Sequence, residues 1–109
     1  MEERRKFPRY ECMFPAKVLK SGDKLKLIKR LSIHNFSREG LKLIINFVSL
    51  KPGSKMDLEF YVPEKRLSTS LSAEIAWIKG LENRMEVGLK IKEMDEKAKN
   101  EILNWIASK

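Results

Sequence analysis

The sequence has 109 residues, a length that fits one domain with a single modest core and excludes a two-lobed enzyme. Hydrophobic residues make up 42% of the chain and charged residues 35%, which is the composition of a globular protein and not of a disordered one. The formal net charge of +8 favours an anionic partner such as a nucleotide, nucleic acid, acidic protein or membrane surface, although lysine-rich solvated faces would give the same charge.

The chain holds one cysteine, Cys12, and one histidine, His34, so it forms no internal disulfide and has too few of these residues for a zinc site. No nucleophile, base and orienting group stand in a recognisable catalytic pattern, and we expect no enzymatic activity. The N-terminus is charged and lacks the apolar segment of a signal peptide, and the longest apolar runs are too short to cross a membrane. These features predict a cytoplasmic protein.

A period-two alternation of apolar residues runs from residue 10 to residue 94 and predicts six β-strands. Ser21-Gly22-Asp23 and Pro52-Gly53 predict turns between strands, as do segments 63–66 and 80–83. Short strands in regular succession, each with one apolar face, predict a mainly β fold, a six-stranded antiparallel barrel. The expected inward residues, strand by strand, are Cys12, Phe14, Ala16 and Val18; Leu25, Leu27, Leu31 and Ile33; Leu41, Leu43 and Ile45; Met56, Leu58, Phe60 and Val62; Leu71, Ala73, Ile75 and Trp77; and Met85, Val87, Leu89 and Ile91.

The end of the chain changes to helical periodicity. Asp95 is a candidate N-cap, and Glu96 follows in the first turn, where the helix dipole favours an acidic residue. Ala98, Ile102 and Ile106 then fall on one face together with Trp105. The pattern predicts a C-terminal α-helix over residues 95–108 that closes one end of the barrel or packs on its side; a helical dimerisation seam is the alternative.

The segment before the first strand contains the motif Arg5-Lys6-Phe7-Pro8-Arg9. The planar guanidinium group of arginine pairs with two phosphate oxygens at once, and it matches the O6 and N7 acceptors of guanine equally well. Pro8 disfavours helical backbone at Phe7, so the arm is extended or kinked and its arginines can reach different parts of one ligand. A solvated basic tail would have the same composition.

A second motif, Asn35-Phe36-Ser37-Arg38-Glu39-Gly40, follows the second predicted strand. Asn35 and Ser37 project to the same side of an extended chain, where the amide offers both a donor and an acceptor to a purine edge and the hydroxyl adds a short polar group. Gly40 allows either a positive φ or the close approach of a ligand. The alternative is a plain asparagine- or serine-type turn that leads into the third strand.

The two motifs, in this order and at this spacing, resemble the bacterial PilZ domain, and the resemblance extends through the strands Ala73-Glu74-Ile75-Ala76-Trp77 and Val87-Gly88-Leu89-Lys90-Ile91 to the terminal helix. It implies a receptor for the second messenger cyclic di-GMP, with a flexible ligand-binding arm at 1–9 and a barrel domain at 10–109. Arg5 and Arg9 would hold phosphates and guanine, and Arg4 would add a contact. Asn35 and Ser37 would bond a guanine, and Gly40 would shape the turn.

The family resemblance also implies an effector protein as partner, in the control of motility, exopolysaccharide synthesis or pili. Two other interpretations remain. One is a small basic barrel that binds single-stranded nucleic acid; it is supported by the charge of +8, but Tyr61 is the only outward aromatic residue that the pattern predicts, because Trp77, Trp105, Phe14 and Phe60 are expected in the core. The other is an adaptor of the same fold that binds no nucleotide, which would require broken motifs.

Overall fold

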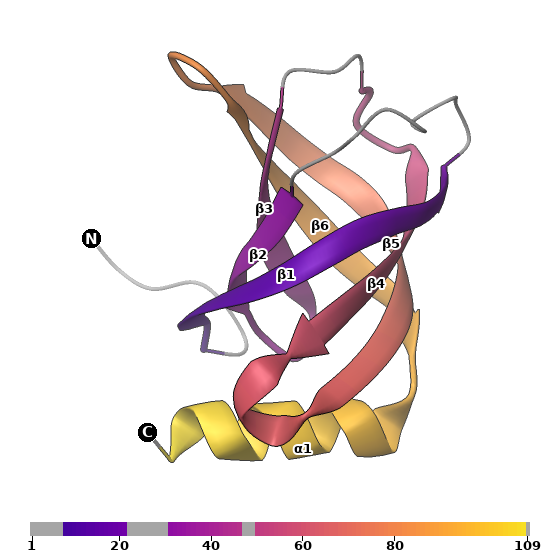
Figure 1. Cartoon of the computed structure of the whole chain (residues 1–109). Helices are drawn as coiled ribbons and strands as arrows, with labels where there is room; N and C mark the ends of the chain where they lie inside the picture. The colour runs from indigo at the N-terminus through magenta and orange to yellow at the C-terminus, as the bar shows by residue number, and fades with distance from the viewer. Residues whose placement is uncertain (1–7, 22–30, 47–49, 109) are drawn as a thin grey trace.

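The computed structural model describes residues 8–21, 31–46 and 50–108 (Figure 1). It confirms the predicted fold class, because six antiparallel strands close into a barrel and an α-helix follows them. The predicted inward residues Leu25 and Leu27, and the Gly22-Asp23 part of the first predicted turn, lie outside the described residues. The elements are β1 (Tyr10–Ser21), β2 (Leu31–Phe36), β3 (Gly40–Ile45), β4 (Lys55–Val62), a short 3-10 helix (Pro63–Lys65), β5 (Leu67–Gly80), β6 (Met85–Met94) and α1 (Glu96–Ala107).

The strands follow one another around the barrel in the order β1-β2-β3-β6-β5-β4. β1 closes the ring because it pairs with β2 on one side and with β4 on the other. In a ring of this order, β3 and β4 stand opposite each other. The outer surface therefore has two separate faces, one around β2 and β3 and one around β1 and β4.

Apolar side chains from every strand fill the interior, as the alternation predicts. Along β4, for example, the predicted inward residues are all at most 1% exposed. Phe14 of β1 stacks on Phe60 of β4 with ring centroids 5.9 Å apart, and Phe36 of β2 lies 5.9 Å from the same ring. Aromatic pairs at this separation add to the stability that area burial alone provides.

One of the expected core residues, Trp77, does not lie in the core. The register of β5 against β6 shifts between Ile75 and Trp77, so that Trp77 pairs with Gly88 and Ile78 pairs with Val87. Val87 is fully buried and points inward, so Gly88, the next residue along the strand, faces outward. A bulge of this kind reverses the side on which the following residues project, and it moves the half-buried Trp77 to the outer surface.

The helix α1 lies across one end of the barrel (Figure 1), in the position expected of a plug. Asp95 is its N-cap, and the Oδ2 atom of its carboxylate accepts a hydrogen bond of 2.9 Å from the backbone N–H of Ala98. The face of the helix that includes Ile102 and Ile106 is buried. Trp105 lies 6.4 Å from Phe14, measured between ring centroids, and so joins the helix to the aromatic interior.

Two of the predicted turns are present, and each contains one residue with a positive φ. Gly53 has a φ of 90°, which agrees with a Pro-Gly turn. Its N–H donates to the carbonyl of Ile75, 2.7 Å away, and this bond ties the turn before β4 to β5. The predicted turn at 63–66 begins with the 3-10 helix and ends at Arg66, which has a φ of 51°.

Gly40 is required by the packing of β3 against β6, and we expect its replacement by alanine to destabilise the fold. A Cβ atom at this position would lie 2.5 Å from the carbonyl oxygen of Leu89, a backbone atom that cannot move without disturbing the ladder. Gly40→Ala should lower the free energy of unfolding by about 1–3 kcal/mol, the usual cost of overpacking. Chemical denaturation measures this loss. Glu39→Ala, at the exposed neighbouring residue, is the control and should change stability by no more than about 0.5 kcal/mol; equal stability of Gly40→Ala and the wild type would contradict the assignment.

Candidate functional site

The loop between β2 and β3 is held closed by Ser37. Its backbone N–H donates to the carbonyl of Gly40 at 2.8 Å, and its hydroxyl donates to the same oxygen at 3.0 Å. The N–H of Gly40 donates in return to Oγ of Ser37 at 3.1 Å. The loop is thus a serine-type turn, and Ser37 is only 4% exposed. One acceptor lone pair of its hydroxyl remains for any further hydrogen bond.

Asn35, at the end of β2, carries an unsatisfied polar atom. Its Oδ1 atom is buried and has no hydrogen-bond donor among the described residues. A buried amide oxygen without a donor costs about 1–3 kcal/mol, so most such groups in proteins have a partner. The Asn35 side chain therefore calls for a donor that the described part of the protein does not supply.

The base of the N-terminal arm lies beside this loop. Tyr10 pairs with Phe36, and Glu11 pairs with Asn35, so Arg9 leaves β1 next to the Ser37 turn. Arg9 is exposed. Strand pairing thereby brings four of the predicted site residues, Arg9, Asn35, Ser37 and Gly40, to one corner of the barrel. The other two, Arg4 and Arg5, lie outside the described residues.

Arg38, inside the second motif, connects the loop to the helix. Its Nη2 atom donates to Oδ1 of Asn100 at 2.8 Å, and its Nη1 atom lies 3.9 Å from a carboxylate oxygen of Glu96. Arg38 also lines a pocket of about 170 Å³, together with Pro8, Tyr10, Leu103, Asn104 and Ala107. The arm, the loop and α1 therefore meet at one place. The sequence analysis gave Arg38 no role, because its partners are about 60 residues away and no sequence pattern marks them.

Strand register extends the site across the outer surface. Asn35 pairs with Lys42, Lys42 pairs with Gly88, and Gly88 pairs with Trp77, so these four residues form one row over β2, β3, β6 and β5. A Cβ atom on Gly88 would collide with the five-membered ring of the Trp77 indole, which shows that the ring lies over the glycine. The sequence analysis missed this aromatic surface. The signal that could have found it is the glycine inside an alternating strand, which often marks the close approach of another group.

His34 lies near the row and hydrogen-bonds to Ser32, with Nε2 and Oγ 2.7 Å apart. Partial burial lowers the pKa of its imidazole below the usual 6.5, and the positive charges of Lys42 and Arg84 lower it further, against an opposing effect of Glu86. Lys42 and Glu86 also form an ion pair at 3.6 Å. The lowered pKa favours the neutral form of the His34 imidazole at pH 7.

The comparisons with known proteins identify the family and the fold. The family model described as "PilZ domain" matches residues 3–108, nearly the whole chain. The chain belongs to the PilZ domain family. PilZ domains are receptor and adaptor domains. Among solved structures, the Bacillus subtilis inhibitor of motility, MotI/DgrA, has the same fold, with a TM-score of 0.81 at 15% sequence identity. The match covers 98% of this chain and 51% of that one, so this PilZ domain protein spans about half the length of MotI/DgrA. A comparison with curated protein sequences gave no match.

The described surface of this PilZ domain offers hydrogen bonding from Asn35, positive charge from Arg9 and Lys42, and the aromatic ring of Trp77. Within residues 8–21, 31–46 and 50–108, no three His, Cys, Asp or Glu side chains lie close enough to hold a metal ion. Over the same ranges, no helix has the length and apolarity needed to cross a membrane.

The position of Trp77 over Gly88 can be tested in solution. In Gly88→Ala, the added methyl group takes the space under the indole and pushes the ring away from the strand. We expect the indole N–H signal of Trp77 in a nitrogen-proton correlation spectrum to move, while that of Trp105, which lies against Phe14, stays in place as the internal reference. An unchanged Trp77 signal would show that the ring does not lie over Gly88.

The lowered pKa of His34 predicts a pH dependence of stability. His34 protonates near pH 6.5 in the unfolded chain and at a lower pH in the folded protein. Its contribution to the free energy of unfolding is therefore fully present above pH 6.5, and it is lost as the pH falls from 6.5 to the pKa of the folded protein. His34 is the only histidine, so its imidazole titration gives the pKa directly. His34→Gln should remove this part of the pH dependence. An imidazole pKa at or above 6.5 would contradict the prediction.

Proposed function

We propose that this PilZ domain protein is a receptor for cyclic di-GMP that catalyses no reaction and signals to a partner protein. The observation that carries the proposal is the pairing of Glu11 with Asn35, which puts the base of the arginine arm beside the second motif. This pairing supports the interpretation that the two motifs, each a weak signal when taken singly, belong to one surface. Family membership over residues 3–108 supports the same conclusion.

The chemistry of the site suits a guanine nucleotide. The Oδ1 atom of Asn35 lacks a donor among the described residues, and the Watson–Crick edge of guanine carries the donors N1–H and N2–H₂. Arg9, together with Arg4 and Arg5 of the arm, would bind phosphates or the O6 and N7 atoms of a guanine. Ser37 and Gly40 would keep the turn in shape, with Ser37 offering its one remaining lone pair.

Trp77 extends the proposed site to a size that fits a dinucleotide. It lies over Gly88, two strands away from Asn35, and two strand spacings amount to about 10 Å. The half-buried indole is an aromatic surface on which a purine can stack, and stacking of a base on an aromatic side chain is worth about 1–3 kcal/mol. One cyclic dinucleotide could therefore contact Asn35 with one base and Trp77 with the other.

A receptor of this kind needs a partner protein, because binding alone has no output. The match to a protein titled "inhibitor of motility" makes motility control one candidate, beside exopolysaccharide synthesis and pili. We place this activity in the cytoplasm, as the sequence analysis expects. Stable nucleic-acid binding is not part of the proposal.

The first prediction of this proposal concerns affinity. Arg9→Ala should weaken cyclic di-GMP binding by about 1.5–3 kcal/mol, the usual loss when a hydrogen bond to a charged group is removed. Isothermal titration calorimetry of the wild type and the variant measures it. Lys51→Ala removes the same charge from an exposed residue just before β4, at the end of the barrel away from Arg9, and should bind like the wild type.

Further variants and ligands distinguish the proposal from its alternatives. Asn35→Ala should lose much of the preference for cyclic di-GMP over cyclic di-AMP, since base contacts carry the selectivity and phosphate contacts do not. GTP and single-stranded RNA are the control ligands. Wild-type affinity in both Arg9→Ala and Arg5→Ala would show that the site is misplaced, and tight RNA binding without cyclic di-GMP binding would favour the nucleic-acid interpretation.

A further inference from the structure

The exposed large hydrophobic side chains of the described residues lie together on two neighbouring strands. Met13 and Leu19 on β1 are 68% and 52% exposed, and Tyr61 on β4 is 41% exposed. Single exposed apolar residues are normal on a protein surface, so the case for a docking surface depends on the pockets and charges around these three. We use the name "β1–β4 face" for the outward residues Met13, Pro15, Leu19, Asp57, Glu59 and Tyr61.

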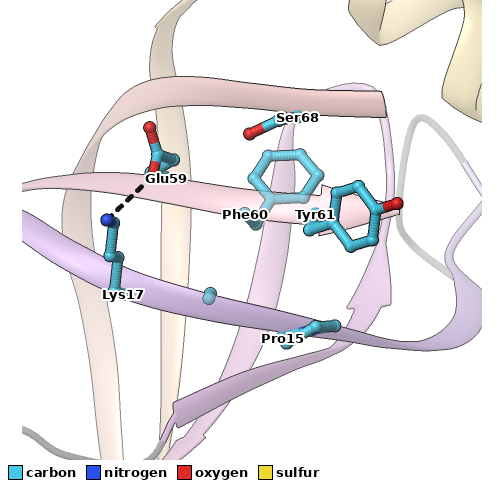
Figure 2. Close-up of a pocket in the computed structure, with 7 residues that line it drawn as sticks. Pro15, Lys17, Glu59, Phe60, Tyr61 and Ser68 are labelled. Carbon is cyan, nitrogen blue, oxygen red and sulfur yellow. Dashed lines mark ion pairs between the residues drawn. The ribbon is translucent and has the colours of Figure 1, made fainter. Parts of the chain in front are cut away.

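Two pockets open on this face. The first has a volume of about 230 Å³, and its lining includes Pro15, Phe60, Tyr61 and Ser68 (Figure 2). The second has a volume of about 260 Å³ and extends from Leu19 and Asp57 over β5. Ser68 lines the first pocket, and Ser70 and Ser72 line the second, because small serine side chains on the outer side of β5 leave space beside the larger residues of β4. The face thus has an apolar hollow at one end and a more polar one at the other.

The charge of the two pockets is opposite to that of the whole chain. Their lining contains four carboxylates and one lysine, which gives a charge of −3, on a protein whose formal net charge is +8. The carboxylates belong to Asp57, Glu59, Glu93 and Asp95, and the lysine is Lys17. An acidic, partly apolar surface on a basic protein favours a partner that is both basic and apolar.

The one ion pair across this face does not oppose such a partner. Lys17 and Glu59 pair at 3.1 Å (Figure 2), but their side chains are 69% and 40% exposed. Pairs this exposed contribute about 0–1 kcal/mol to stability. A lysine or arginine from a partner can therefore share or replace the contact with Glu59 at little cost.

The β1–β4 face is separate from the candidate nucleotide site. β4 stands opposite β3 in the closed ring. β5 and β6 contribute to both surfaces, but Trp77 and Gly88 of the row are each five residues from Ser72 and Glu93 of the second pocket, about 16 Å along the strands. A ligand of this row and a partner on the β1–β4 face can therefore be bound at the same time.

We propose that the β1–β4 face docks an extended segment of a partner protein. The residues on the bound side of that segment, which are every second residue, include both apolar residues and lysine or arginine. The distance from Met13 to Leu19 along β1 is about 20 Å, which matches six residues of extended chain. Apolar side chains of the segment would enter the hollow between Pro15 and Tyr61 and pack on Leu19, and its cations would face Asp57 and Glu59. This docking surface does not depend on the binding of cyclic di-GMP.

The test uses fluorescent eight-residue peptides and the full chain. The lysine–leucine peptide has leucine and lysine in turn at every second position, with serine between them, so that both kinds of side chain lie on one side of the extended chain. Fluorescence anisotropy should give at least tenfold tighter binding for it than for the glutamate–leucine peptide, with glutamate in place of lysine, or for a peptide with serine in place of leucine. Tyr61→Ser and Leu19→Ser should each weaken the first peptide at least fivefold, and added salt should weaken it as well. Leu81→Ser, at a partly exposed leucine of the turn between β5 and β6, is the matched control and should bind like the wild type.

Other outcomes would overturn the proposal. Equal binding of the lysine–leucine and glutamate–leucine peptides would contradict charge complementarity as the basis of recognition. Unchanged binding by Tyr61→Ser and Leu19→Ser would show that the peptide binds outside the β1–β4 face. If sedimentation shows a dimer that Tyr61→Ser dissociates, then the face binds a second copy of this chain. Both substitutions are at exposed positions, so unchanged thermal melting confirms folding. Calorimetry with cyclic di-GMP should give wild-type affinity for Tyr61→Ser and Leu19→Ser. If the wild type itself does not bind cyclic di-GMP, that result contradicts the receptor proposal and leaves the docking proposal unaffected.

Discussion

The contact between three phenylalanine rings inside the barrel is the interaction on which the rest of the structure depends. Phe60 lies 5.9 Å from both Phe14 and Phe36, so that one ring joins β4 to β1 and β2. Trp105 adds the helix to the same cluster. Because neighbouring residues of a strand point to opposite sides, the packing of these rings also fixes Pro15, Asn35 and Tyr61, which are their neighbours in β1, β2 and β4. The positions of both candidate surfaces therefore follow from the packing of the core.

The alternation of apolar residues was enough to predict the fold, since burial of one face of each strand leaves few other arrangements. It failed at Trp77 for a specific reason. The bulge between Ile75 and Trp77 is an irregularity of the backbone pairing. The small apolar residue at Ala76 does not distinguish it from a regular strand. Gly88, on the partner strand, is the residue whose type reflects the bulge, because the Trp77 indole occupies the space that a side chain at Gly88 would fill. Sequence patterns of one strand cannot show what depends on two.

The residues of the candidate site could be identified from their motifs, but their physical roles could not. Gly40 was expected to have a positive φ or to admit a ligand, whereas its lack of a side chain serves the close packing of β3 on β6 at Leu89. The hydroxyl of Ser37 was expected to face a ligand, and the structure uses it to close the turn. Asn35 is the motif residue left with an unmet hydrogen bond among the described residues. Such distinctions require the geometry of partners distant in sequence.

β1 is the strand that both candidate surfaces share. It begins beside the Ser37 turn, where Tyr10 pairs with Phe36, and its outward residues from Met13 onward belong to the β1–β4 face. The register against β2 shifts between Glu11 and Phe14, at the point where one part ends and the other begins. A bulge bends the strand and increases its twist, so the two ends of β1 can face different sides of the barrel without a break in the chain. One strand, pinned in the middle by Phe14, thus holds an arginine arm on one surface and an apolar, acidic face on the other.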